Sequence, residues 1–254
     1  MNNDSDNDPV LKSSELLAYR RANGQLPDFP VPRAVIFAPQ KSLADYILRH
    51  HSAKRIRGFL GEFHLLTRTG GQLALSANFG IGAPVIAGLT DEFAALGVQR
   101  FVLIGMAGGL QPELNAGSLV LSKNAIRGEG VSQHYLSPNP TVDSSPEMLR
   151  GLSEILTKHN QHHTLGTTWT TDAPFRELRK DVLRHQSDGV LAVDMEAAAM
   201  LAVAGSLKLS ALAMFSIADQ LAGGKWRMAN DLRASQKGLT VLFDAVFEYL
   251  ISAP

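Results

Sequence analysis

Residues 80–121 read GIGAPVIAGLTDEFAALGVQRFVLIGMAGGLQPELNAGSLVL, and this stretch decides the fold class. A glycine turn leads into a predicted helix over 85–97, which Gly97 ends. A buried strand is predicted over 100–110, running into a second glycine turn, and another strand over 118–127. Strands that alternate with helices in this way predict an α/β sandwich with ligand sites at the carboxyl ends of its strands.

The same alternation extends over the rest of the chain. Further strands are predicted at 34–39, at 63–78 (a pair that turns at Gly70-Gly71), at 163–171, at 189–193 and at 210–219. Further helices are predicted at 11–24, 42–50 (with Ser42 as N-cap), 146–160, 175–186, 195–207 and 231–251. No linker or internal repeat divides the sequence, so we predict one domain over 31–254. An N-terminal extension over 1–30 precedes it, and its Asn/Asp-rich start is predicted to be disordered.

Composition narrows the classes of function. Of the 254 residues, 45% are hydrophobic and 19% are charged, an ordinary globular balance. The 24 basic residues equal the 24 acidic ones, so the basic excess typical of nucleic-acid-binding proteins is missing. The absence of cysteine excludes disulfides, thiolate metal sites and a cysteine nucleophile. The sequence has no signal-peptide pattern and no apolar run near the ~20 residues of a membrane span. We therefore expect a cytoplasmic protein without membrane or nucleic-acid partners.

Residues 193–199, VDMEAAA, place two carboxylates around a methionine at the start of a predicted helix of small residues. From the residues alone, Glu196 fits the first turn of that helix, where the helix dipole favours negative charge. Asp194 fits a helix cap or a packing position better than a catalytic one.

Four stretches together resemble a known family: residues 80–121, AIRGEGVSQHYLSP, TTWTTDAPFREL, and GVLAVDMEAAAMLAVA with SIADQL after it. Their order and spacing are similar to those of nucleoside phosphorylases, a family that includes purine and uridine phosphorylases and related nucleosidases. EGxSxHYL and WTTDAPFRE look closest to the uridine-phosphorylase-like branch. The resemblance covers roughly 34–222. It implies a three-layer α/β/α sandwich with a central mixed β-sheet, a nucleoside substrate, and a homo-oligomer (dimer or trimer of dimers).

The resemblance also implies roles for particular residues. Glu196 would accept hydrogen bonds from ribose hydroxyls, and Met195 would pack against the sugar. Cleavage of an N-glycosidic bond builds positive charge on the ribose, which a fixed carboxylate stabilises. Asp219, in SIADQL, would give a proton to the departing base, although Ala218 stands where the family usually has serine. On the alternative interpretation, Asp219 simply begins a polar loop.

The base pocket falls on TTDAPFRE in this resemblance. Phe175 would stack on the base and Arg176 would bind a pyrimidine carbonyl, unless both are ordinary residues at the start of a helix. His134 would contact the sugar or a neighbouring subunit, unless it is structural. Gly105, Met106 and Ala107, in the second glycine turn, would contact substrate.

The phosphate site departs from the family pattern. Leu43 and Leu103 stand where the family has arginines, Pro39 replaces a glycine, and Met106 replaces a hydroxyl residue. Each lost charge-assisted hydrogen bond removes about 1.5–3 kcal/mol of binding free energy. An arginine lent by a neighbouring subunit would be one of Arg55, Arg57 and Arg68. Gln40 and Lys41 are poor substitutes for the glutamate base of the hydrolytic nucleosidases.

Three functions follow as alternatives. The first is phosphorolysis, with phosphate as co-substrate and ribose 1-phosphate and free base as products. The second is hydrolysis by water, and the third is a catalytically weak nucleoside- or nucleobase-binding homologue. No cofactor and no metal site are predicted: HNQHH at 159–163 lacks partner ligands at suitable spacing, and neither glycine turn gives the G-x-G-x-x-G of a dinucleotide site. GGKWR at 223–227 is predicted to be a loop near the pocket.

Overall fold

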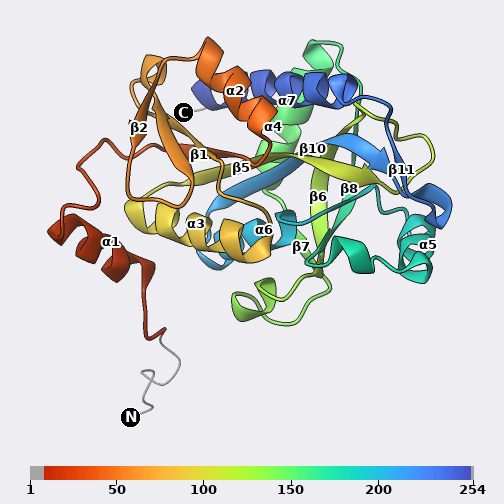
Figure 1. The fold of residues 1–254 in the computed structure, drawn as a ribbon, viewed down its shortest axis with the longest axis horizontal. Helices are drawn as coiled ribbons and strands as arrows, with labels where there is room; N and C mark the ends of the chain where they lie inside the picture. Colours follow the sequence, from red (N-terminus) through yellow and green to blue (C-terminus); the bar gives the residue numbers. More distant parts are fainter. Residues whose placement is uncertain (1–8, 253–254) are drawn as a thin grey trace.

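The computed structural model describes residues 9–252, so the predicted disorder of residues 1–8 lies outside the described part of the chain. Figure 1 shows three layers, with a twisted sheet between two groups of helices, which confirms the predicted α/β/α sandwich with a mixed sheet. The strands are β1 (Ala34–Ala38), β2 (Ala53–Ile56), β3 (Glu62–Leu66), β4 (Leu73–Ala77), β5 (Arg100–Gly109), β6 (Leu119–Gly128), β7 (Thr141–Asp143), β8 (His163–Thr171), β9 (Ala192–Asp194), β10 (Ser210–Gln220) and β11 (Arg227–Met228). The helices are α1 (Ser13–Ala22), α2 (Lys41–His50), α3 (Ala83–Leu96), α4 (Pro146–Lys158), α5 (Arg179–Ser187), α6 (Ala197–Ser206) and α7 (Arg233–Ser252). Short 3-10 turns are η2 (Thr67–Thr69), η3 (Ser132–His134), η4 (Pro174–Arg176) and η5 (Ala222–Gly224).

The sheet closes on itself around its centre. β5 pairs in parallel with β1 and β10, and β10 pairs antiparallel with β6. β6 and β9 both pair in parallel with β8, and β9 returns antiparallel to β5 at Gly108 and Gly109. β5, β10, β6, β8 and β9 therefore form a ring, and the carboxyl ends of β5 and β10 lie side by side at one end of it.

Two apolar cores lie on the two faces of the sheet. One packs α3 and α6 against the sheet, and the small residues of α6 from Ala197 to Ala204 are all buried there. The other packs α2, α4 and α7 against the opposite face. β1 is buried along its whole length, which explains its continuously apolar sequence AVIFA. Among the described residues, no helix combines the length and the apolar character needed to cross a bilayer.

The first helix is packed against the body of the molecule. The Ser13 hydroxyl donates to an Asp91 carboxylate oxygen at 2.6 Å, and Arg20 pairs with Glu92 at 2.7 Å, both on α3. Leu17 is 2% exposed. The part of the predicted extension that the structure describes thus shares the core of the larger body.

Several predicted boundaries move by a few residues. Ser42 is not the N-cap of α2, because the helix begins at Lys41 with Gln40 as its N-cap and without a side-chain cap. α5 begins at Arg179 rather than 175, because residues 174–176 form a separate 3-10 turn. The short strands β2, β7 and β11 were not predicted from the sequence.

Candidate active site

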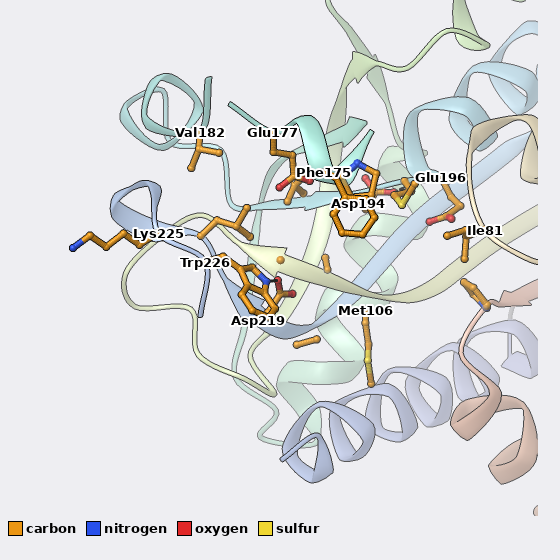
Figure 2. Close-up of a pocket in the computed structure, with 18 of the residues that line it drawn as sticks. Ile81, Met106, Phe175, Glu177, Val182, Asp194, Glu196, Asp219, Lys225 and Trp226 are labelled. Atoms are coloured by element: carbon orange, nitrogen blue, oxygen red, sulfur yellow. Dashed lines mark hydrogen bonds between the residues drawn. The ribbon is translucent and has the colours of Figure 1, made fainter. Parts of the chain in front are cut away.

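A cavity of about 720 Å³ opens at the carboxyl ends of β5 and β10. Figure 2 shows side chains from several distant segments converging on it. Its walls come from the end of β1, the loop before α3, the ends of β5 and β10, η4 and α5, the start of α6, and the loop after η5. The lining residues are Pro39, Gln40, Ile81, Met106, Ala107, Gly108, Pro174, Phe175, Glu177, Arg179, Val182, Val193, Asp194, Met195, Glu196, Ala218, Asp219, Leu221, Gly224, Lys225 and Trp226.

Glu196 occupies one end of the cavity as the N-cap residue of α6. Its side chain is buried, and one carboxylate oxygen accepts a hydrogen bond of 2.6 Å from the backbone N–H of Gly82. Burial, followed by the nearby charge of Asp194, raises the pKa of Glu196 to about 7, against the effect of the Gly82 hydrogen bond. A carboxylate held at this depth is an acceptor ready for a ligand's hydroxyl groups.

Asp194 holds this end of α6 in place. One of its oxygens accepts from the N–H groups of Glu196 and Ala197, at 2.7 and 2.6 Å, and the other accepts from the Thr170 hydroxyl at 2.8 Å. Burial raises its pKa to about 6 although these three hydrogen bonds favour the charged form. The prediction that Asp194 caps the helix is confirmed, and its effect is to fix the direction of Glu196.

Asp219 lies across the cavity from Glu196, at the end of β10 (Figure 2). A bulge between Ile217 and Asp219 turns this end of the strand, and β11 pairs with it. The indole N–H of Trp226 donates to an Asp219 carboxylate oxygen at 2.7 Å. Burial raises the pKa of Asp219, and the Trp226 hydrogen bond opposes that rise. The loop GGKWR thus lies at the cavity, as expected from the sequence.

Glu177 is a further lining carboxyl group, which sequence reasoning did not single out. Burial, followed by the charge of Asp219, raises its pKa to about 7. Glu177 stands next to Arg176 in the quoted stretch TTDAPFREL, but only the structure, where η4 ends at Arg176 and Glu177 is extended, shows which of the two side chains lines the cavity.

The other predicted site residues divide into two groups. Met195, Met106, Ala107 and Phe175 line the cavity, and Phe175 is 99% exposed at its mouth. Three do not line it: Arg176, Gly105 and the exposed His134 of η3.

The positions expected to hold phosphate are apolar. Leu43 and Leu103 are buried in the cores on opposite faces of the sheet, and neither lines the cavity. In the described part of the chain, the cations that line it are Arg179 and Lys225, both at the Trp226 end. Three arginines were candidates for a contribution from a neighbouring subunit, and none of them lines the cavity of its own chain: Arg55, Arg57 and Arg68.

The fold and the cavity are those of an α/β protein with a small-molecule site at the carboxyl ends of its strands. The chain belongs to the phosphorylase superfamily, whose family model matches residues 33–250. Members of this family act on nucleosides at the glycosidic bond.

The relatives of this chain are named for different activities. The chain is 28% identical over 151 residues to a guanosine phosphorylase from Halorubrum lacusprofundi, covering 59% of this chain and 63% of that protein. It is 32% identical over 94 residues to a uridine phosphorylase from Thermococcus kodakarensis, covering 37% of this chain and 34% of that protein. Both matches therefore span less than two thirds of the relative. The crystal structure of an AMP nucleosidase from Bacteroides thetaiotaomicron has the same fold, with a TM-score of 0.71 and 22% identity over 93% of this chain and 98% of that one.

Proposed function

We propose that this protein cleaves the N-glycosidic bond of a ribonucleoside, with Glu196 binding the ribose hydroxyls. The observation that carries the proposal is the buried carboxyl group of Glu196 at one end of the cavity, directed by Asp194 and Gly82. A carboxylate in this position accepts hydrogen bonds from a vicinal diol, and Met195 beside it offers an apolar contact to the sugar ring. Both features suit a pentose better than a planar base.

Bond cleavage would use the charge of Glu196. As the C1′–N bond breaks, its electron pair goes to the base and positive charge grows on the ribose ring. The carboxylate stabilises this charge more in the transition state than in the ground state, which lowers the barrier. The departing base takes up a proton, and carboxyl groups line the end of the cavity where the base would lie, Asp219 and Glu177 among them.

The family name makes phosphate the first candidate for the acceptor, giving ribose 1-phosphate. Water is the second candidate, and a specific observation favours it. The lining residues from the loop after β1 and from β5 include Pro39, Gln40 and Met106, and the two cations of the described chain that line the cavity, Arg179 and Lys225, lie at the Trp226 end instead. A dianion bound there would depend on backbone amides or on a cation from another subunit, whereas water needs neither.

One assay tests the activity and separates the acceptors. The protein is incubated with uridine, adenosine, inosine and methylthioadenosine, with and without inorganic phosphate, and free base is measured. Release only with phosphate supports phosphorolysis, and equal release without it supports hydrolysis. Binding of these nucleosides in calorimetry without any release would contradict the enzymatic proposal and leave a binding protein.

Two variants test the site. Glu196→Gln keeps the shape and the contact to Gly82 but removes the charge, so base release should fall about 100-fold or more. Glu154→Gln is the matched control, because Glu154 is an exposed carboxyl on α4 outside the cavity. Full activity in Glu196→Gln would remove this assignment of the ribose site.

A further inference from the structure

Two carboxyl groups share the end of the cavity where the base would lie, and their surroundings differ. Asp219 accepts a hydrogen bond of 2.7 Å from the indole N–H of Trp226, which favours its ionised form. Within residues 9–252, no N–H or O–H group donates to the carboxyl group of Glu177. Glu177 is half-buried and lies within the electrostatic influence of Asp219. Of two interacting carboxyl groups, the one without a donor is the one that keeps a proton.

We propose that Glu177 is the carboxylic acid that protonates the departing base, while Asp219 remains ionised under Trp226. This assignment rests on the proposed function and differs from the role that resemblance gives to Asp219. The negative charge of Asp219 would then favour the protonated form of Glu177, and Asp219 itself would not donate the proton. Asp219 is a positioning residue in this arrangement, and Glu177 is the catalytic residue.

The proton transfer balances in either reaction. The C1′–N bond breaks with its electron pair moving to the base, and the Glu177 O–H bond breaks as a new bond to hydrogen forms on the base. C1′ gains a bond to the oxygen of water or of hydrogen phosphate, and that acceptor loses one proton. This proton restores Glu177, so the products are neutral base and either ribose or ribose 1-phosphate.

Charged groups from several elements face this end of the cavity. Asp219 comes from β10, Arg179 from α5, next to Gly224, and Lys225 from the loop after η5. Glu196 lies at the other end, and Asp194 accepts a hydrogen bond from its backbone N–H. Burial, followed by the charge of Asp219, raises the pKa of Glu177 to about 7. A carboxyl group with its pKa raised in this way can carry a proton near neutral pH, which suits a general acid.

The experiment compares two leaving groups. A purine or uracil base needs a proton to leave, whereas p-nitrophenolate leaves as a stable anion, so p-nitrophenyl β-D-riboside does not need the acid. In Glu177→Gln, kcat/KM for the best nucleoside should fall about 100-fold or more, at least tenfold further than for the nitrophenyl riboside. The wild-type rate with nucleoside should be bell-shaped in pH, rising as Glu196 ionises and falling as Glu177 loses its proton. The falling limb should be lost in Glu177→Gln. Glu177→Asp keeps a carboxylic acid and should regain part of the loss.

Asp219→Asn should differ from Glu177→Gln, because it keeps the proposed acid and changes only its surroundings. Removing the charge of Asp219 should lower the pKa of Glu177 and move the alkaline limb to lower pH. At pH values below this limb, where Glu177 is protonated, the variant should show no loss that depends on the leaving group. Glu154→Gln serves again as the control, and circular dichroism checks that each variant is folded. A leaving-group-dependent loss in Asp219→Asn but not in Glu177→Gln would overturn the assignment, as would equal losses of Glu177→Gln on both substrates. A wild-type protein that cleaves neither substrate would instead contradict the proposed function itself.

Discussion

Glu196 and Asp194 are both buried, two residues apart in the sequence. Burial raises the pKa of both carboxyl groups, and the charge of Asp194 raises the pKa of Glu196 further. The three hydrogen bonds to Asp194 and the one from Gly82 to Glu196 offset only part of this rise. Charge held against burial in a cavity is typical of functional sites, where stability is reduced in favour of activity. The pair therefore links the proposed chemistry to a measurable dependence of stability on pH.

The sign of this dependence follows from the two states of Glu196. Its pKa is about 7 in the folded protein and about 4.3 in an unfolded chain. Between these values the folded state binds the extra proton, so the free energy of unfolding falls as pH rises through this window. Glu196→Gln removes this term and should be more stable than the wild type at pH 8, by on the order of 2 kcal/mol. Urea denaturation at pH 4 and pH 8 measures it, and a variant that is no more stable at pH 8 would contradict the burial of the charge.

At the residue scale, sequence reasoning reached part of the site. The resemblance of two stretches to the nucleoside phosphorylases selected Glu196 and Asp219, and both residues line the cavity. Glu177 was not singled out, because it follows the 3-10 turn η4 in an extended conformation, and the direction of a side chain at such a junction is not fixed by sequence spacing. Arg176 was selected because the resemblance places the base pocket on TTDAPFRE and an arginine can bind a pyrimidine carbonyl, but Arg176 does not line the cavity, whereas its neighbour Glu177 does.

At the element scale, α7 lies close against β10 because one of its positions lacks a side chain. A Cβ on Gly238 would overlap the hydroxyl oxygen of Ser216 and lie 2.9 Å from the Ser216 Cβ. Both residues are buried, so the helix would have to move away from the strand that carries Asp219. The interface between α7 and the sheet is thus set by a small residue rather than by a large apolar one.

Two glycine-to-alanine substitutions test this interface. Gly238→Ala should destabilise the fold by about 1–3 kcal/mol, because overpacking forces the backbone apart. Gly88→Ala is the matched control in α3, where a Cβ would meet no atom within 4 Å. It should stabilise the fold by about 0.5–1 kcal/mol, since alanine restricts the unfolded chain and favours helix. Chemical denaturation measures both, and similar effects of the two substitutions would contradict the close approach of α7.

Element types were more predictable than element ends. The apolar periodicity of α3 and α4 and the continuous apolar run of β1 predicted these elements because burial imposes those patterns. The start of α6 was placed two residues early, since Asp194 caps the helix from within the preceding strand. β11 has only two residues, both exposed, so it leaves no apolar pattern to detect.

At the scale of the whole molecule, the closed ring of strands joins the two halves of the chain. β5, from the first half, pairs with both β10 and β9 from the second. Each apolar core also contains residues from both halves of the chain. Neither half can unfold without exposing the apolar surface of the other, so we predict one cooperative unit over the described chain, in agreement with the single domain expected from its sequence.

Unfolding followed by two probes tests this prediction. Far-UV circular dichroism reports helices on both faces of the sheet, and fluorescence reports mainly Trp169, which is 8% exposed in the folded protein. Their denaturation midpoints should coincide if the ring unfolds as a whole. Trp226→Phe isolates the Trp169 signal. It removes the hydrogen bond to Asp219 but little buried surface, because the Trp226 side chain is 67% exposed, so the free energy of unfolding should fall by only about 1–2 kcal/mol. Separate transitions for the two probes would mean that the strand ring does not couple the two halves, and that the cavity between β5 and β10 can open while the helices remain folded.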